Sequence, residues 1–282
     1  MKKTVTAALI GTMVLALGIG SLSVPAGEKW NRGDTAVKAE IDDISIDWAS
    51  GKVDVLYGEG DAVTIETTPA DLDEDDKAEW RMDGTKLKIR EKSKVRIFNF
   101  FSPEKTLTVT IPKGRTMKEL SIEVASGEVF SEVNADELEL DCASGSHEIV
   151  LSEPAKKIDF DAASGSLLLT APKAEELELH LSSGKADFTV TEVGEFKIDI
   201  ASGSIKGRMS SFSEGSIDAS SGDVDLWLPA DAGFTASVDQ ASGDFNSDLA
   251  MKMQGKKYVF GDGSGSLDIE TASGDVMIHE AK

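Results

Sequence analysis

Cysteine and histidine are scarce in this sequence, and each scarcity excludes a kind of site. Cys142 is the only cysteine of the 282 residues, so no intramolecular disulfide can form, and it lies too far from the N-terminus to carry a lipid anchor. The three histidines, His147, His180 and His279, include no pair at the spacing of metal ligands. The cysteine and histidines therefore predict no metal centre of their own, and we expect no cofactor.

Basic residues are few relative to acidic ones. The chain has 29 lysines and arginines against 51 aspartates and glutamates, which gives a formal net charge of -22. A surface with that charge repels nucleic acid, which we exclude as a partner, and it also repels an anionic membrane face. The charge is compatible with a solvated coat, with a surface that associates with cations, or with a protein that binds a basic molecule.

Long uncharged runs are also rare, and the N-terminus contains the one that bears on location. A basic start, Lys2-Lys3, is followed by no charge between Thr4 and Gly27, and small residues precede Gly27 where a signal peptidase would cut. An uncleaved segment of this length would also span a bilayer. We predict that residues 1–26 are a signal peptide or a membrane-anchor helix. The chain is then extracytoplasmic, either membrane-anchored or secreted into the cell envelope.

A small residue followed by Ser-Gly occurs nine times, and each occurrence ends a short run in which apolar and polar residues alternate. The alternation turns one face of a strand inward, and an apolar column resumes two residues after most of the glycines. Between Gly127 and Gly243 successive glycines are 18 to 21 residues apart, a regularity typical of stacked coils. The repeat glycines are Gly51, Gly127, Gly145, Gly165, Gly184, Gly203, Gly222, Gly243 and Gly274.

The composition of this corner has a physical explanation. The residue before Ser-Gly is always alanine or serine, which indicates a tight position. The serine hydroxyl is expected to hydrogen-bond the turn backbone or the stacked copy, and the glycine to adopt positive φ or to permit a close backbone approach. We predict an all-β fold, a single-stranded β-solenoid with about 19 residues per coil. Irregular β coils at 27–118 begin it, and the regular Ser-Gly-repeat solenoid occupies 119–282.

An acidic residue stands four positions before eight of the nine repeat glycines, and His180 takes the remaining place. Stacked coils would bring neighbouring carboxylates to about 5 Å, where their repulsion costs up to ~1 kcal/mol per pair. Three explanations stay open: hydrogen bonds to the turn backbone, diffuse association with cations, and a stoichiometric Ca²⁺ site. The candidate cation-associating column comprises Asp141, Asp161, Asp199, Asp218 and Asp239.

A basic and aromatic segment between Lys92 and Lys105 contrasts with the acidic remainder of the chain. Its combination of arginine and phenylalanine suits a membrane interface or a partner protein, although the aromatic rings would equally serve to cover the end of the solenoid. The candidate contact residues are Arg96, Phe98, Phe100 and Phe101. We expect no catalytic residues, because no arrangement of serine, histidine and aspartate suits nucleophilic catalysis.

Three parts of the sequence resemble a known family. The strand Leu107–Pro112, the Ser-Gly repeats from Leu120 onward and the closing segment Gly263–Val276 are similar to the "putative adhesin" β-strand-repeat family, a domain of unknown function in Gram-positive cell-envelope proteins. The resemblance covers roughly residues 40 to 282. It implies a β-solenoid outside the cytoplasmic membrane. Some relatives are tied to envelope-stress and antimicrobial-peptide responses, and the family supplies no catalytic residues.

We therefore predict a non-catalytic, adhesin-like binding module of the cell envelope. Its partner would be an envelope protein, a wall polymer or a cationic peptide, with membrane contact through the N-terminal segment if that segment is uncleaved. Two alternatives stay open. A polysaccharide-acting β-helix enzyme would need clustered acids in a cleft, and a purely structural, self-associating surface element would need no ligand site.

Overall fold

The computed structural model describes residues 29–91 and 105–281. The predicted signal or anchor segment at 1–26 lies outside the described residues, and so do the predicted contact residues Arg96, Phe98, Phe100 and Phe101. Within the described ranges no helix is both long enough and apolar enough to cross a membrane.

The described chain is all-β apart from one short 3-10 helix, η1 (Glu74–Asp76). The strands of the N-terminal part are β1 (Asn31–Arg32), β2 (Thr35–Val37), β3 (Asp43–Gly58), β4 (Val63–Thr68), β5 (Glu79–Asp83), β6 (Lys86–Arg90) and β7 (Thr106–Pro112). The middle strands are β8 (Met117–Ser131), β9 (Ala135–Val150), β10 (Ala155–Ala162), β11 (Ser166–Leu181), β12 (Lys185–Ile200), β13 (Ser204–Arg208), β14 (Ser211–Ala219) and β15 (Asp223–Leu228). The last strands are β16 (Phe234–Gln240), β17 (Phe245–Ser247), β18 (Met251–Gln254), β19 (Lys257–Phe260), β20 (Gly265–Thr271) and β21 (Val276–Glu280).

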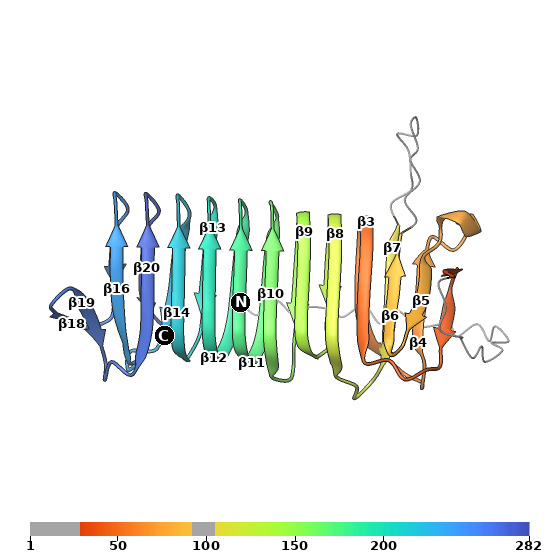
Figure 1. The fold of residues 1–282 in the computed structure, drawn as a ribbon, viewed down its shortest axis with the longest axis horizontal. Coiled ribbons are helices and arrows are strands. Elements are labelled where there is room, and N and C mark those ends of the chain that lie inside the picture. Colours follow the sequence, from red (N-terminus) through yellow and green to blue (C-terminus); the bar gives the residue numbers. More distant parts are fainter. Residues whose placement is uncertain (1–28, 92–104, 282) are drawn as a thin grey trace, which may run out of the picture.

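Each regular coil consists of two strand segments joined at a Ser-Gly corner, and successive coils pair in parallel. Sequence alternation decides which side chains enter the core: in β12, Phe188 and Val190 are buried and Thr189 between them is exposed. The register carries this pattern from coil to coil, since Leu169 pairs with Phe188 and Phe188 pairs with Gly207. The result is a rod of parallel strands side by side (Figure 1).

Stacked apolar columns fill the rod along its length. One column stands five residues before the corner glycines, and all of its nine members except the half-buried Val238 are at most 1% exposed. Its members across six neighbouring coils are Ile46, Ile122, Leu140, Phe160, Leu179 and Ile198. Burial of such side chains contributes roughly 1.5–3 kcal/mol each before chain entropy is subtracted. The hydrophobic core therefore forms only when coils stack, because each coil buries its apolar side chains against its neighbours.

The N-terminal coils do not follow sequence order. The coil of β3 lies directly beside that of β8, and Ile46 pairs with Ile122, which follows it by 76 residues in the sequence (122 minus 46). On its other side β3 pairs with β6 and β7, which together make one further coil without a Ser-Gly corner. The irregular region thus supplies one coil beyond β3, and the strands outside that coil are antiparallel.

The last coil of the chain is not the last coil of the rod. Ile269 in β20 pairs with Ile217 of β14 on one side and with Val238 of β16 on the other. β21 lies in the same way between β15 and β17. The coil of Gly274 is therefore inserted between the coils of Gly222 and Gly243, and Figure 1 shows β20 between β14 and β16.

Antiparallel strands cover both layers at one end of the rod and one layer at the other. At one end β5 pairs with β6 and β4 pairs with β7, and at the other end β19 pairs with β16 and β18 pairs with β19. An uncovered parallel edge would template further strands. The change of strand direction ends the regular stack at both ends.

Candidate functional site: an acidic groove beside the corners

The corners are held in line by hydrogen bonds between neighbouring coils. Ser183 donates its backbone N–H (2.9 Å) and its hydroxyl (3.3 Å) to the carbonyl of Ala163. Ser202 donates in the same way to the carbonyl of Ser182, at 3.0 and 3.2 Å. The serine hydroxyl therefore bonds to the preceding coil, as expected from the sequence, and fixes the vertical register of the corner.

The corner glycines allow the turns to approach closely. Gly145 has φ 137°, and a Cβ atom built there would lie 1.8 Å from the carbonyl oxygen of Gly127 in the coil beside it. No side chain fits at that distance, because non-bonded carbon and oxygen atoms need more than 3 Å. The corners consequently stack at the spacing of the strands themselves.

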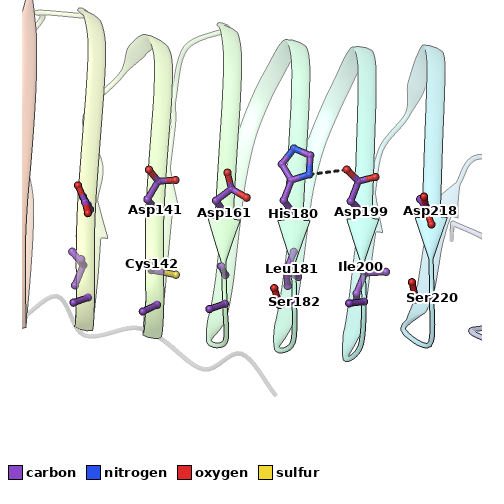
Figure 2. A pocket seen from close by; sticks show the side chains of 17 residues that line it. Asp141, Cys142, Asp161, His180, Leu181, Ser182, Asp199, Ile200, Asp218 and Ser220 are labelled. Atoms are coloured by element: carbon purple, nitrogen blue, oxygen red, sulfur yellow. Dashed lines mark ion pairs between the residues drawn. The ribbon is translucent and has the colours of Figure 1, made fainter.

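One outward side chain per coil lies four residues before each corner, and the register brings these side chains into a single row. Glu123 pairs with Asp141, which pairs with Asp161, and Asp199 pairs with Asp218 further along. Figure 2 shows the row from Asp141 to Asp218. In spatial order this acidic file is Asp47, Glu123, Asp141, Asp161, His180, Asp199, Asp218, Glu270 and Asp239.

A shallow groove of about 690 Å³ runs beside the file, next to the corner turns. Its wall consists of the file from Glu123 to Asp218, so the groove crosses six coils. Small corner residues, each two positions after a file residue, also line it and leave the space open: Ala125, Ala143, Ala163, Ser182, Ala201 and Ser220. A second hollow among the described residues, lined by Lys52, Glu128 and Glu148, is smaller, at about 260 Å³.

Negative charge in the groove is poorly compensated around Asp141. Burial raises the pKa of the Asp141 carboxyl above its ordinary value, and the neighbouring Glu139 and Asp161 raise it further. A raised carboxyl pKa means that the folded protein holds the ionised form at a cost. A cation that entered the groove here would offset that cost.

The middle of the file is partly neutralised. Nδ1 of His180 lies 2.8 Å from a carboxylate oxygen of Asp199, and Nζ of Lys197 lies 2.7 Å from the same oxygen. Figure 2 marks the His180–Asp199 contact. His180 thus takes the place of an acid in the file and lies in contact with the carboxylate of the next coil.

Among the described residues, Asp159, Glu178 and His180 form a cluster of potential metal ligands. Their ligand atoms lie within 4.8 Å of one another, and two carboxylates with an imidazole suit a divalent metal. Nζ of Lys157, however, lies 2.5 Å from Glu178 and 3.2 Å from Asp159. The ammonium group of Lys157 already pairs with both carboxylates, so the cluster is an ion-pair network.

The thiol in the groove offers no nucleophile. Cys142 is 7% exposed, and burial together with Asp141 and Asp161 raises its pKa to about 11. The thiol is therefore protonated at neutral pH, whereas nucleophilic attack requires the thiolate.

Four of the five predicted column residues line the groove, namely Asp141, Asp161, Asp199 and Asp218. Asp239 belongs to the same file but lies beyond the groove, beside Glu270. Sequence reasoning missed the contact of Asp159 and Glu178 with Lys157. The sequence does contain a signal, because Asp159 and Glu178 each stand two residues before a member of the file. Their contact across coils can be inferred only once the strand register is known.

Comparison with known proteins gives a family and a fold. The family model described as Toastrack DUF4097 matches residues 41–280. A solved structure of a "putative adhesin" from Bacteroides fragilis NCTC 9343 is 13% identical with a TM-score of 0.51, and the match covers 91% of this chain and 99% of that chain. No curated protein matches the sequence.

Two solved structures from Parabacteroides distasonis ATCC 8503 also match over most of their length. A "putative lipid binding protein" is 19% identical with a TM-score of 0.48, covering 90% of this chain and 98% of that chain. A "putative adhesin" is 16% identical with a TM-score of 0.35, covering 92% of this chain and 99% of that chain. The Bacteroides fragilis likeness supports the stacked β architecture, and the resemblance to an adhesin-like repeat family of unknown function is confirmed.

Proposed function

Because this chain belongs to the Toastrack DUF4097 family, we propose that it is a non-catalytic, adhesin-like surface module whose acidic groove binds a cationic partner. The acidic file is the observation that carries the proposal. It places a carboxylate in every coil except that of His180, on a hydrogen-bonded backbone with coils about 4.8 Å apart, along a groove that small residues keep open. A rigid array of like charges favours a ligand that carries several opposite charges.

The groove favours a cationic peptide over the other two predicted partners. Five of the six file residues in its wall are acidic, and the raised pKa of Asp141 marks charge that the chain itself leaves uncompensated. An extended basic segment would meet several carboxylates at once. A neutral wall polymer would gain nothing from the charge, and an envelope protein would need a basic surface of matching length.

We propose further that the module acts outside the cytoplasmic membrane, in the cell envelope. The uncharged segment within residues 1–26 would deliver or anchor it, and coils of about 19 residues would space the carboxylates. The name of the Bacteroides fragilis structure agrees with a surface role, and its likeness to this chain is one of fold. Origin in a Gram-positive envelope and a link to envelope stress are proposals that rest on the family resemblance alone.

Binding of a fluorescent oligolysine peptide tests the groove. The double variant Asp161→Asn/Asp199→Asn removes two groove carboxylates, and we expect it to weaken binding by about tenfold at low salt, since each close charge contributes up to ~1 kcal/mol. The control Asp71→Asn/Asp231→Asn removes the same charge from two exposed positions outside the groove. It should change the affinity by less than about twofold.

Equal losses in the two variants would contradict the groove as the binding site, because binding would then follow net charge alone. Turnover of an acidic polysaccharide that the groove variant abolishes would replace the proposal with the enzymatic alternative.

A further inference from the structure

At the C-terminal end of the rod, the outermost strands extend one layer of the coil beyond the other. β19 continues the layer of β16, and β18 continues it again. The opposite layer ends with β17, which in the described chain pairs with β21 alone. The core-facing side of β18 and β19 therefore reaches past the last complete coil.

The register shows which side chains this leaves uncovered. Met253 pairs with Tyr258, and Tyr258 pairs with the fully buried Ala236. Directly opposed residues share a face, so Met253 and Met251 prolong a core column that has no further layer to cover it. Met253 is 67% exposed and Met251 is 44% exposed, and the other exposed large hydrophobic residue of the described chain is Leu168 at 48%.

The same segment is positively charged, whereas the molecule as a whole is negatively charged. Residues 249–260 contain Lys252, Lys256 and Lys257 and no acid, in a chain of net charge -22. The flanking acids are engaged elsewhere: Asp248 lies 3.3 Å from Nδ1 of His279, and Asp262 accepts a hydrogen bond from the backbone of Ser264. The hairpin β18–β19 is thus both basic and apolar at one tip of an acidic rod.

We propose that this hairpin, residues 251–260, docks on an anionic lipid surface. Met251 and Met253 would enter the interfacial region, since unbranched thioether side chains adapt to a fluid partner. The lysine stems would lie along the interface with their ammonium groups at the lipid headgroups. Each basic residue near such a surface raises partitioning by roughly fivefold.

The general repulsion between an acidic protein and an anionic membrane is reduced at this tip. The nearest member of the acidic file, Asp239, is in β16, two strands from β18, or about 10 Å. Salt at physiological strength screens exposed charges over about 8 Å. Contact through the end of the rod therefore keeps the file outside the range of the headgroup charge.

A lipid interface suits the hairpin better than the acidic groove of a second copy. The methionines lie on one face of β18, whereas Lys252 pairs with Val259 on the opposite face. A bilayer interface can surround β18 and so contact the methionine face and the lysine face together. A protein groove would cover one face and leave the other in water.

A site-specific dye on the full chain tests the proposal. An environment-sensitive fluorophore is attached to Met253→Cys, and the control is the same dye on Leu168→Cys, which is exposed in the middle of the rod. Cys142 is buried with a pKa of about 11, so it stays unlabelled at neutral pH. Both proteins share residues 1–28, so any attachment through that segment acts equally on the two dyes.

We expect vesicles of phosphatidylglycerol and phosphatidylcholine to shift the emission of the dye at 253 to the blue, and to leave the dye at 168 unchanged. Replacing all three lysines by glutamine should raise the lipid concentration needed for half of the shift by roughly a hundredfold. The Asp161→Asn/Asp199→Asn variant should keep the shift, because the groove takes no part. No shift at 253, or equal shifts at both positions, would overturn the proposal. A shift that depends on protein concentration without vesicles would assign the hairpin to a second copy instead.

Discussion

At the scale of the residue, the corner glycine decides whether two coils can meet. Gly145 combines positive φ with a carbonyl oxygen that a Cβ would approach to 1.8 Å. Gly84 also has positive φ, at 65°, but nothing lies within 4 Å of the place where its Cβ would be. The two residues separate the conformational demand from the steric one.

Gly145→Ala should therefore destabilise the fold far more than Gly84→Ala. We expect a loss of more than about 3 kcal/mol at Gly145, where the stacked backbone must move, and about 1 kcal/mol at Gly84, where only the backbone conformation is strained. Urea unfolding followed by circular dichroism measures both. Similar losses would mean that the corners are not in contact.

His147 is a second residue whose surroundings set a measurable property. It is 2% exposed, neither ring nitrogen has a hydrogen-bond partner in the described structure, and burial lowers its pKa from 6.5 to about 4. Between pH 6.5 and 4 the unfolded chain binds a proton that the folded chain does not. Stability contributed by the neutral imidazole is present above that window and is lost as the pH falls through it.

His147→Leu should remove this part of the pH dependence, and the side chain suits the column because Leu167 occupies the paired position. The wild-type chain should lose on the order of 3 kcal/mol more than the variant between pH 7 and pH 4. Urea unfolding at the two pH values measures the difference. The control Val129→Ala alters the residue paired with His147 in the neighbouring coil without changing a titratable group, and it should keep the wild-type pH dependence. If His147→Leu lost as much stability as the wild type, the ring would be protonated in the fold.

At the scale of the element, the inserted last coil is tied to its neighbours by side chains of β21. The ring of His279 stacks on Trp227 at 4.5 Å between centroids. Its Nε2 lies 2.7 Å from Asp225 in β15, and its Nδ1 lies 3.3 Å from Asp248, which follows β17. One residue thus joins the last coil to both coils that flank it.

His279→Ala should loosen β20 and β21 without unfolding the rod. We expect the amides of these strands to lose protection by about 1–2 kcal/mol, because a stacked ring and two polar contacts disappear together. Hydrogen exchange read by mass spectrometry locates the effect. His180→Ala, in the middle of the file, should leave β21 unchanged, and an equal effect there would contradict a local tie.

Much of each element could be predicted from the sequence, but the order of the coils could not. The alternation in segments such as Lys185–Val190 predicts strands with one buried face, and the Ser-Gly corner predicts where each strand turns. The corners of Gly222, Gly243 and Gly274 are chemically equivalent, so they contain no information about which coils are neighbours. Packing supplies it: Phe234 stacks on Phe260 of the cap at 4.3 Å, which places the β16 coil at the end.

The candidate site was predictable to the same degree. The constant position of Asp141 and Asp161 relative to their corners predicts a file of carboxylates, because the side-chain period and the repeat length agree. The contact between Lys157 and Glu178 could not be predicted, since it joins two coils through side chains of different columns. The groove is open because small corner residues lie next to the file. The sequence shows these residues but does not show that they and the carboxylates line a common groove.

At the scale of the whole molecule, repulsion between the many negative charges destabilises the folded state. The net charge of -22 is carried by a rod whose file places carboxylates on adjacent strands. Self-repulsion of this kind weakens as salt shortens the range of the field. Stability should therefore rise with ionic strength.

Raising NaCl from a low concentration to about 0.5 M should increase the free energy of unfolding by on the order of 1 kcal/mol. Urea unfolding at several salt concentrations measures the trend. The Asp161→Asn/Asp199→Asn variant should show a smaller increase, because part of the repulsion is already gone. A stability that fell with salt would mean that attractive ion pairs, such as that of Lys157, outweigh the repulsion.

The central claim is that the coils stack in register, with the coil of Gly274 between those of Gly222 and Gly243, because the acidic file and the exposed hairpin both depend on that order. Cysteine cross-linking at the corners tests it directly. Ser221 and Ser273 have their hydroxyl oxygens 3.3 Å apart, so Ser221→Cys/Ser273→Cys should form a disulfide readily under mild oxidation. Ser221→Cys/Ser242→Cys, which joins consecutive corners in the sequence, should not. A disulfide in the second pair and none in the first would contradict the account.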